Sequence, residues 1–175
     1  MNVDLALLSA LVLVITGVAA YLLLGGFFWG AGYTPVPRES MALMFLFSEP
    51  LAGKRVMDLG SGFGRILIEA AEMHGVHATG VEMDPVKVWW SRMIISRRGL
   101  LGRARIVRAN LMTANLSDVD VVYAFLWMGV MRRLKDKVLA EMKHGSLVVS
   151  YYHRFAGWEP AMEDKTLRVY AYRIP

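Results

Sequence analysis

A long apolar run near the amino terminus is the strongest pattern in the chain. Residues 5–29 read LALLSALVLVITGVAAYLLLGGFFW, and no residue from Leu5 to Pro37 carries a side-chain charge. About 20 apolar helical residues cross the core of a bilayer, so the run predicts one transmembrane helix. A secretory signal peptide and a buried core helix are the alternatives, but a signal peptide has a basic start and a shorter apolar core.

Beyond this run, short apolar stretches alternate with segments of helical periodicity. We expect strands at residues 55–59, 77–83, 104–110, 118–126, 145–152 and 167–174, and helices at residues 65–73 and 132–142, with a further helix beginning at Pro85. Strands that alternate with helices predict a mostly parallel, doubly wound α/β sheet. The chain is therefore expected to form two parts, an anchor at residues 1–30 and an α/β domain at residues 31–175.

Charge suggests how the anchor is oriented. The segment before the apolar run contains Asp4 and no Lys or Arg, whereas Arg38, Lys54 and Arg55 follow it. Positively charged flanks stay on the cytoplasmic side, so the domain is expected to face the cytoplasm, or the matrix side in an organelle. The net charge of +5 suits an anionic membrane surface, a nucleic acid or simply a solvated basic face. The absence of cysteine excludes disulfides and thiolate metal sites.

The most informative motif follows the first expected strand. It has the spacing Asp58-x-Gly60-x-Gly62-x-Gly64. A glycine-rich turn between a strand and a helix lets a ligand approach backbone N–H groups closely. Dinucleotide sites use the spacing GxGxxG and have no use for an acid at this position. The amino-acid tail of S-adenosylmethionine carries an ammonium that an acid can face and a carboxylate that the turn amides can receive. Ser61 and Arg65 belong to the same motif.

The ends of the next two strands supply further candidates. Glu82 follows the glycine turn by about twenty residues, where an acid can accept both hydroxyls of a ribose. Its alternative role is a helix N-terminal charge, with Asp84 as the cap and Pro85 as the first helical residue. Asn110 either bonds an adenine edge, with Leu111 and Met83 flanking the ring, or only forms a turn.

With these residues placed, the chain resembles class I seven-strand S-adenosylmethionine-dependent methyltransferases. More narrowly, it is similar to the protein-lysine methyltransferases of the Dot1-like type, which include small archaeal and membrane-anchored mitochondrial enzymes. The resemblance covers about Tyr33 to Trp158. The segments that carry it are Tyr33-Thr-Pro-Val-Pro37, Asp58-Leu-Gly-Ser-Gly-Phe-Gly-Arg65, Gly80-Val-Glu82, Ala109-Asn110-Leu111, Val149-Ser150 and Gly157-Trp158-x-Pro160.

The resemblance implies a Rossmann-like seven-strand fold with a shortened last strand pair. It implies cofactor roles for the glycine motif and Glu82, a position for Tyr33 near the transferring methyl group, and a catalytic role for Ser150. The chain departs from the family after the fourth strand, where Leu126-Trp127-Met128-Gly129 replaces a polar stretch. No convincing general base stands out: Asp118 and Asp120 lie at the wrong end of a strand, and His153 is either a base or simply solvated.

These observations predict a membrane-anchored methyltransferase that uses S-adenosylmethionine, needs no metal and methylates lysine in a protein. The expected partners are a membrane-associated protein substrate and membrane lipid along residues 5–29, with no nucleic acid. Two alternatives remain open. The first is methylation of a lipid headgroup or a membrane-borne small molecule, which Trp127 and Met128 favour, and the second is a non-catalytic cofactor-binding scaffold.

Overall fold

The structure of the protein is a computed structural model. It describes residues 4–29 and 34–175, with side chains for residues 4–21 and 34–175. The chain divides into two compact units, Met1–Thr34 and Pro35–Pro175.

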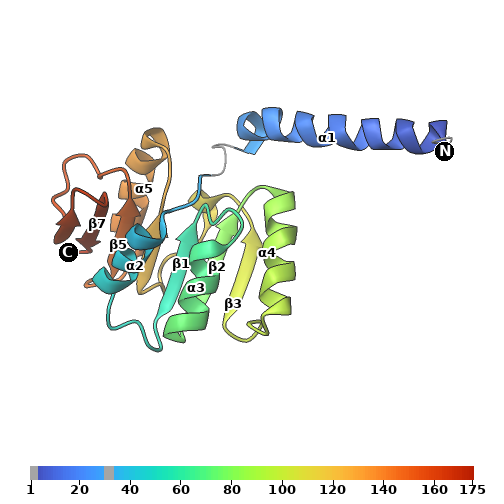
Figure 1. Cartoon of the computed structure of the whole chain (residues 1–175). Coiled ribbons are helices and arrows are strands. Elements are labelled where there is room, and N and C mark those ends of the chain that lie inside the picture. Colours follow the sequence, from blue (N-terminus) through green and yellow to red (C-terminus); the bar gives the residue numbers. More distant parts are fainter. Residues whose placement is uncertain (1–3, 30–33) are drawn as a thin grey trace. The chain divides into compact units, whose positions relative to one another are not determined.

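The first unit contains one helix, α1 (Leu5–Trp29), over the same residues as the uncharged apolar run (Figure 1). The side chains from Leu5 to Ala20 are exposed along its length. Among the residues that the structure describes, no helix is both long and apolar enough to span a membrane.

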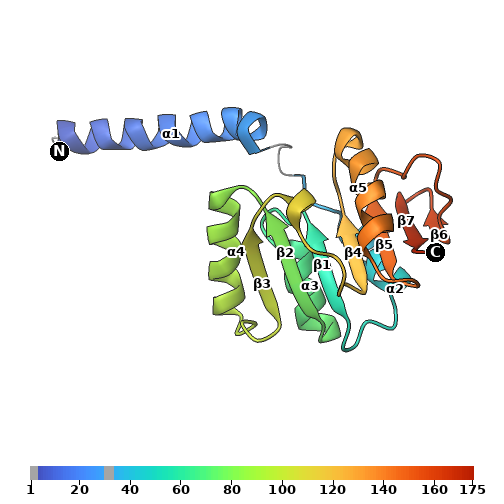
Figure 2. The same ribbon diagram turned by 180° about the vertical axis from the view of Figure 1, so that it is seen from behind.

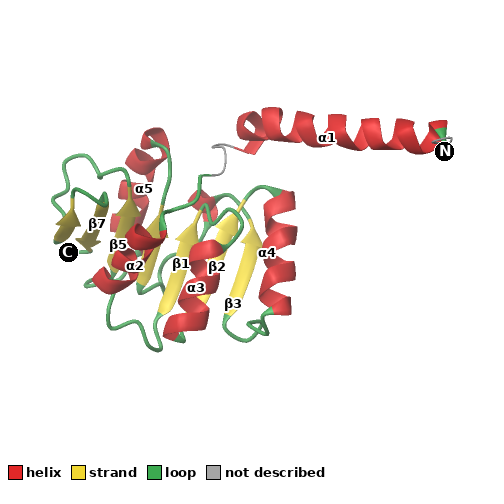
Figure 3. Cartoon of the chain, in the orientation of Figure 1, coloured by secondary structure: helices red, strands yellow, loops and turns green. Residues whose placement is uncertain are grey.

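The second unit is built on a seven-stranded sheet (Figure 3). Its order is β3-β2-β1-β4-β5-β7-β6. The first five strands are parallel, and β7 runs antiparallel to both β5 and β6. The strands are β1 (Arg55–Leu59), β2 (His77–Glu82), β3 (Ala104–Arg108), β4 (Val121–Ala124), β5 (Leu147–Tyr151), β6 (Met162–Asp164) and β7 (Val169–Arg173). This confirms the predicted Rossmann-like α/β fold, with β6 as the shortened strand.

Helices cover the sheet on two faces, as the views from opposite sides show (Figures 1 and 2). One face carries α2 (Arg38–Phe47), α3 (Arg65–His74) and α4 (Pro85–Arg97), and the other carries α5 (Met128–Glu141). Successive residues of each strand face opposite sides, so Val56 joins the first core cluster and Met57 joins the second.

Several predicted boundaries were wrong, each for a local reason. The third strand ends at Arg108, because the side chain of Asn110 caps a short 3-10 helix, η1 (Leu111–Thr113). Helix α5 begins at Met128, four residues before the predicted start at Arg132. Helix α2 and strand β6 were not predicted: α2 lies between the proline segment and β1, and β6 has only three residues, too few to show a clear alternation.

Gly80 in β2 allows the sheet to pack closely against α3 and the glycine turn. A Cβ atom there would lie 2.3 Å from the Leu67 side chain and 2.7 Å from Ser61 Oγ. We expect Gly80→Ala to lower the free energy of unfolding by about 1–3 kcal/mol through overpacking. Gly129→Ala is the matched control, since nothing lies within 4 Å of that position. Urea denaturation measures both, and an unchanged midpoint for Gly80→Ala would contradict the packing argument.

Candidate active site

The glycine turn joins β1 to α3 at the carboxyl edge of the parallel strands. Gly60, Gly62 and Gly64 all have positive φ angles, of 77°, 55° and 78°. Residues other than glycine rarely adopt a positive φ angle. In addition, a Cβ atom at Gly60 would lie 2.7 Å from the side chain of Leu126. The N–H groups of Gly60 and Ser61 donate to the carbonyl of Val81 at 2.9 and 3.1 Å, which ties the turn to the end of β2. The motif therefore forms the close backbone cradle that the sequence predicts.

Asp58, near the end of β1, is almost fully buried and lacks a complete set of partners. Burial raises the pKa of the Asp58 carboxyl, and the negative charge of Glu82 raises it further, to about 7. A hydrogen bond from the backbone of Leu67 acts in the opposite direction and lowers the pKa. Its Oδ2 atom and the Oγ atom of Ser61 are buried without a hydrogen-bond partner. An unpaired buried polar atom is costly, so this pair of atoms suits a ligand that donates hydrogen bonds.

Glu82 organises the backbone around the same point. Its Oε2 accepts the N–H of Gly62 at 2.8 Å, and its Oε1 accepts the N–H groups of Met83 and Asp84, both at 2.9 Å. A carboxylate offers about four acceptor positions, so one position on Oε2 remains for an external hydroxyl. The predicted cap is also confirmed, because Asp84 accepts from the first turn of α4. Glu82 thus holds the glycine turn against the start of α4 and retains one acceptor position that a ribose hydroxyl can use.

The candidates for the adenine contact follow the ends of β2 and β3, and Asn110 has a local role. Asn110 is exposed, and its Oδ1 accepts the N–H of Met112 at 2.9 Å. This is the geometry of the turn-forming alternative. Leu111 and Met83 are half-buried. The adenine contact of these three residues stays a prediction.

Arg65 links the glycine motif to the proline segment. Its guanidinium Nη1 donates to the carbonyl of Val36 at 2.8 Å, and Val36 itself is buried. The segment 35–37 therefore lies next to the first turn of α3. Tyr33, for which the sequence predicts a place near the transferring methyl group, lies outside the described residues.

Ser150 lies in β5 and is fully buried. Its hydroxyl donates to the carbonyl of His153 at 2.9 Å and so holds the chain where it turns after the strand. The catalytic role that the sequence resemblance implies for Ser150 stays a prediction.

An aromatic cluster that was not predicted from the sequence lies at the ends of β4 and β5. Phe125, Tyr151 and Tyr152 have ring centroids 4.8 to 6.4 Å apart. The signal was available as two adjacent tyrosines at the end of the fifth expected strand, followed by His153. Their proximity to Phe125 could not be known without the strand order.

The groups present fit S-adenosylmethionine. The buried, unpaired Oδ2 of Asp58 can accept from the ammonium, and Glu82 can accept from a ribose hydroxyl. The N–H groups of the turn residues Gly60, Ser61, Gly62 and Gly64 already donate within the protein, so the predicted donation from turn amides to the carboxylate stays a prediction. Among the described residues, no group of three or more His, Asp or Glu gathers in a way that could hold a metal ion.

Comparisons with known proteins agree with this geometry. The ANTKMT methyltransferase domain family matches residues 58–162. A protein-lysine N-methyltransferase of Saccharolobus islandicus is 35% identical over 149 residues, covering 81% of this chain and 92% of the relative. The adenine nucleotide translocase lysine N-methyltransferase of Mus musculus is 34% identical over 122 residues. The match covers 69% of this chain and 53%, about half, of the mouse protein.

A solved structure extends the comparison to the cofactor. An RNA methyltransferase of Salinibacter ruber in complex with S-adenosyl-L-homocysteine superposes with a TM-score of 0.77 at 29% identity, covering 81% of this chain and 94% of that chain. S-adenosylhomocysteine is what remains of S-adenosylmethionine after methyl transfer, so the cofactor is the one the site fits. The chain is an enzyme and not a non-catalytic scaffold: it belongs to the ANTKMT methyltransferase domain family and is a class I, S-adenosylmethionine-dependent methyltransferase.

Proposed function

We propose that the enzyme transfers the methyl group to the side chain of a lysine in a protein. The observation that carries this proposal is the match to the Saccharolobus islandicus protein-lysine N-methyltransferase over 92% of its length. The mouse relative is also named as a lysine methyltransferase. The name of the Salinibacter ruber protein points instead to RNA, so the acceptor has to be tested directly.

The residues of the chain would bind and orient the reactants. S-adenosylmethionine supplies a methyl group on a positively charged sulfur, which an amine can attack directly. Asp58 would hold the ammonium of the amino-acid tail, the glycine turn would let that tail approach the backbone closely, and Glu82 would hold the ribose. Leu126 lies against the turn at Gly60 and presents an apolar wall there. Such a displacement depends mainly on alignment and on the exclusion of water.

We also propose that residues 1–30 anchor the enzyme to a membrane and that its substrate is membrane-associated. The support is the uncharged run from Leu5 to Pro37 and the exposure of its apolar side chains, such as Leu5 at 78% and Leu13 at 73%. A large exposed apolar surface calls for an apolar partner. The positive residues that begin with Arg38 would keep the domain at residues 31–175 on the cytoplasmic side. A tether raises the effective concentration of substrates in the same membrane.

One labelling experiment tests both proposals. The full chain is expressed in a bacterial host, and the membranes are washed with alkaline carbonate and incubated with tritiated S-adenosylmethionine. We expect the chain to stay with the washed membranes and the label to enter the protein fraction after lipid extraction and nuclease treatment. Release of the chain by carbonate would contradict anchoring. The absence of protein label would contradict lysine methylation.

Methylation of a lipid headgroup is the second candidate, and one observation favours it. Trp127 and Met128 follow β4 and are 65% and 67% exposed, so the edge that carries the site presents an apolar surface. A lipid or a membrane-borne small molecule would suit such a surface. Label that enters only the lipid extract would establish this function in place of protein methylation.

A further inference from the structure

The aromatic cluster lies beside the cofactor site. The strand register pairs Leu59 with Ala124 and Ala124 with Ser150, so Phe125 and Tyr151 follow at the same edge as the glycine turn. Neighbouring strands are about 4.8 Å apart, which places the end of β5 roughly 10 Å from the end of β1. The Phe125 ring contacts Tyr151 at 4.8 Å and Tyr152 at 6.4 Å between centroids. Phe125 follows β4, which lies directly beside β1, so an amine held against its ring is within about one strand spacing of the glycine turn.

Two unusual backbone conformations hold a cation against this cluster. Tyr152 has a φ angle of 72° and Arg168 has a φ angle of 54°, although neither is glycine. The Tyr152 N–H donates to the carbonyl of Arg168 at 2.7 Å, and the Arg168 guanidinium lies 4.4 Å from the centre of the Tyr152 ring. Left-handed conformations of such residues are strained, and this strain gathers at functional sites.

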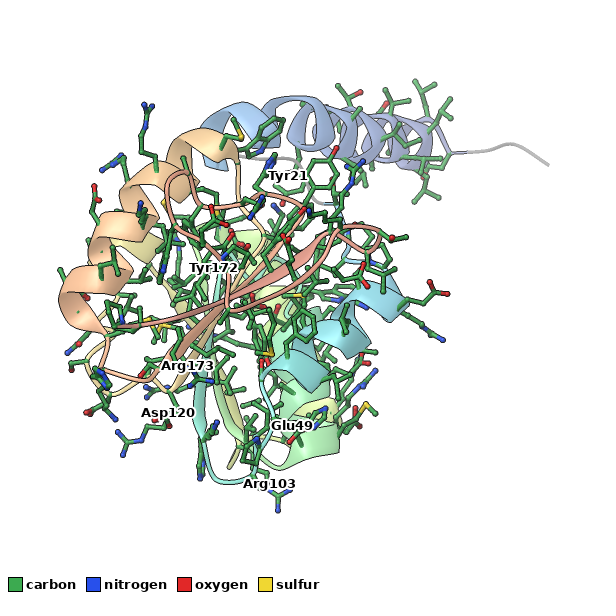
Figure 4. The ribbon with its side chains drawn as sticks, turned by 90° about the vertical axis from the view of Figure 1, so that its left-hand side faces the viewer. Tyr21, Glu49, Arg103, Asp120, Tyr172 and Arg173 are labelled. Atoms are coloured by element: carbon green, nitrogen blue, oxygen red, sulfur yellow. The ribbon has the colours of Figure 1, made fainter. Side chains whose placement is uncertain are left out.

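Buried hydrogen bonds fix the loop that carries Tyr152. Ser150 Oγ donates to the carbonyl of His153, and the hydroxyl of Tyr172 accepts the N–H of Phe155 at 3.1 Å. Figure 4 labels Tyr172, which is fully buried. The ring of Tyr152 is therefore held in position from both sides of the loop, yet it is itself 44% exposed and open to a ligand.

We propose that Phe125, Tyr151 and Tyr152 form the methyl-acceptor site, and that the adjacent guanidinium of Arg168 favours the neutral, nucleophilic form of the incoming amine. This inference rests on the proposed lysine methylation and names the residues that receive the lysine. Arg168 acts through the amine as a positioning residue, and no general base is required.

The chemistry of the transfer explains why a fixed positive charge helps. A free lysine amine has a pKa of about 10.4 and is almost entirely protonated at neutral pH. A nearby like charge and an apolar surrounding both favour its deprotonated form, and the proton leaves to solvent. The nitrogen lone pair then forms a bond to the methyl carbon while the carbon–sulfur bond breaks and leaves its electron pair on sulfur. The positive charge thereby passes from sulfur to the methylated nitrogen, again beside Arg168.

Other charged and titratable groups surround the cluster. Ser40 of α2 donates to the carbonyl of Leu167, and Asp164 accepts the N–H of Leu167, so both elements adjoin the Arg168 turn. The end of β5 and the loop after it carry Tyr151, Tyr152, His153 and Arg154, and Arg154 pairs with Glu159 and Glu163. Asp164 lies in β6, Arg38 and Glu39 lie in α2, and Asp58 and Glu82 belong to the cofactor site. Saturating cofactor removes the titration of Asp58 from the measured rate.

The test is the pH profile of methyl transfer by the full chain. The probe is the carbonate-washed bacterial membrane fraction, and initial rates of protein labelling are measured at saturating tritiated S-adenosylmethionine. Arg168→Gln should shift the rising limb of the profile by about one unit towards higher pH. The rate of methyl transfer should therefore fall about tenfold near neutral pH and largely recover at high pH. Arg168→Lys should restore the wild-type limb.

Two further variants separate this role from a structural one. Arg103→Gln also removes one positive charge, but Arg103 precedes β3 at the opposite edge of the sheet, so its profile should match the wild type (Figure 4). Tyr152→Gly removes both the ring and the strained conformation. It should leave the melting temperature unchanged or higher while lowering the labelling rate at least about tenfold.

The outcomes are distinct. An absence of protein labelling by the wild type would overturn the proposed function and this inference with it. Protein labelling with the same pH profile in Arg168→Gln would overturn only the role of Arg168. Full activity of Tyr152→Gly would overturn the assignment of the aromatic cluster, as would a shift in Arg103→Gln equal to that in Arg168→Gln.

Discussion

Replacing Glu82 with alanine is expected to abolish measurable cofactor binding and to destabilise the fold. The Glu82 carboxylate accepts three backbone N–H groups, from Gly62, Met83 and Asp84, and it is 8% exposed. Each buried donor left without a partner costs about 1–3 kcal/mol. Because water would satisfy some of the three N–H donors in place of the carboxylate, we expect the free energy of unfolding to fall by roughly 3 kcal/mol. The same change loosens the glycine turn and removes the acceptor for the ribose.

Glu82→Gln is the matched control, because it keeps one oxygen acceptor and nearly the same volume. It should retain much of the stability while weakening binding of S-adenosylhomocysteine by about 10- to 100-fold. Urea denaturation without cofactor measures the stability, and titration calorimetry measures the binding. Wild-type affinity in Glu82→Ala would show that the cofactor lies elsewhere.

Cofactor affinity is expected to depend on pH through Asp58. The pKa of its carboxyl is raised to about 7, first by burial and then by the charge of Glu82. Only the carboxylate can pair with the ammonium of the cofactor, so binding must expel the proton from Asp58 at low pH. We expect the affinity for S-adenosylmethionine to be level above about pH 8 and to fall about tenfold for each unit below about pH 7. Calorimetry in buffers of different ionisation enthalpy should show proton release on binding below that pH.

The Asp58→Asn variant removes both the charge and the titration. It should bind S-adenosylmethionine weakly, with little change between about pH 6 and pH 8. Stability provides a separate check on the cofactor-free enzyme. Because the folded pKa of Asp58 lies above the unfolded value of 3.8, its contribution to stability is complete below about pH 4 and is lost as the pH rises to about 7. Asp58→Asn should not show this loss. A wild-type affinity that is constant from pH 6 to pH 8 would contradict the assignment.

Six of the seven strands and the glycine turn could be predicted because local residues determine them. The run Arg55 to Leu59 is apolar enough to be a buried strand, and three alternating glycines after it leave few conformations other than a tight turn. Asp58 and Glu82 could be placed at one edge because the carboxyl ends of parallel strands share an edge. The cofactor follows from these residues almost without tertiary information.

The acceptor side could not be predicted in the same way. The contact between Phe125 and Tyr152 depends on β4 lying next to β5, and the position of Arg168 over Tyr152 depends on the reversal of β7. Nothing in the local sequence around Arg168 indicates a positive φ angle. Likewise, the sequence offered a ribose contact or a helix N-terminal charge for Glu82. Its hydrogen bonds to the N–H groups of Gly62 and Asp84 could not be predicted, because they arise only when the two loops meet.

The most direct test of the central claim is amino-acid analysis of the labelled protein. Washed membranes are incubated with the full chain and tritiated S-adenosylmethionine, and the protein fraction is hydrolysed in acid. We expect the radioactivity to co-elute with methylated lysine and to be absent when Asp58→Asn or Glu82→Ala replaces the wild type. Radioactivity that is confined to lipid, to nucleic acid or to amino acids other than lysine would contradict the claim that this enzyme is a protein-lysine methyltransferase.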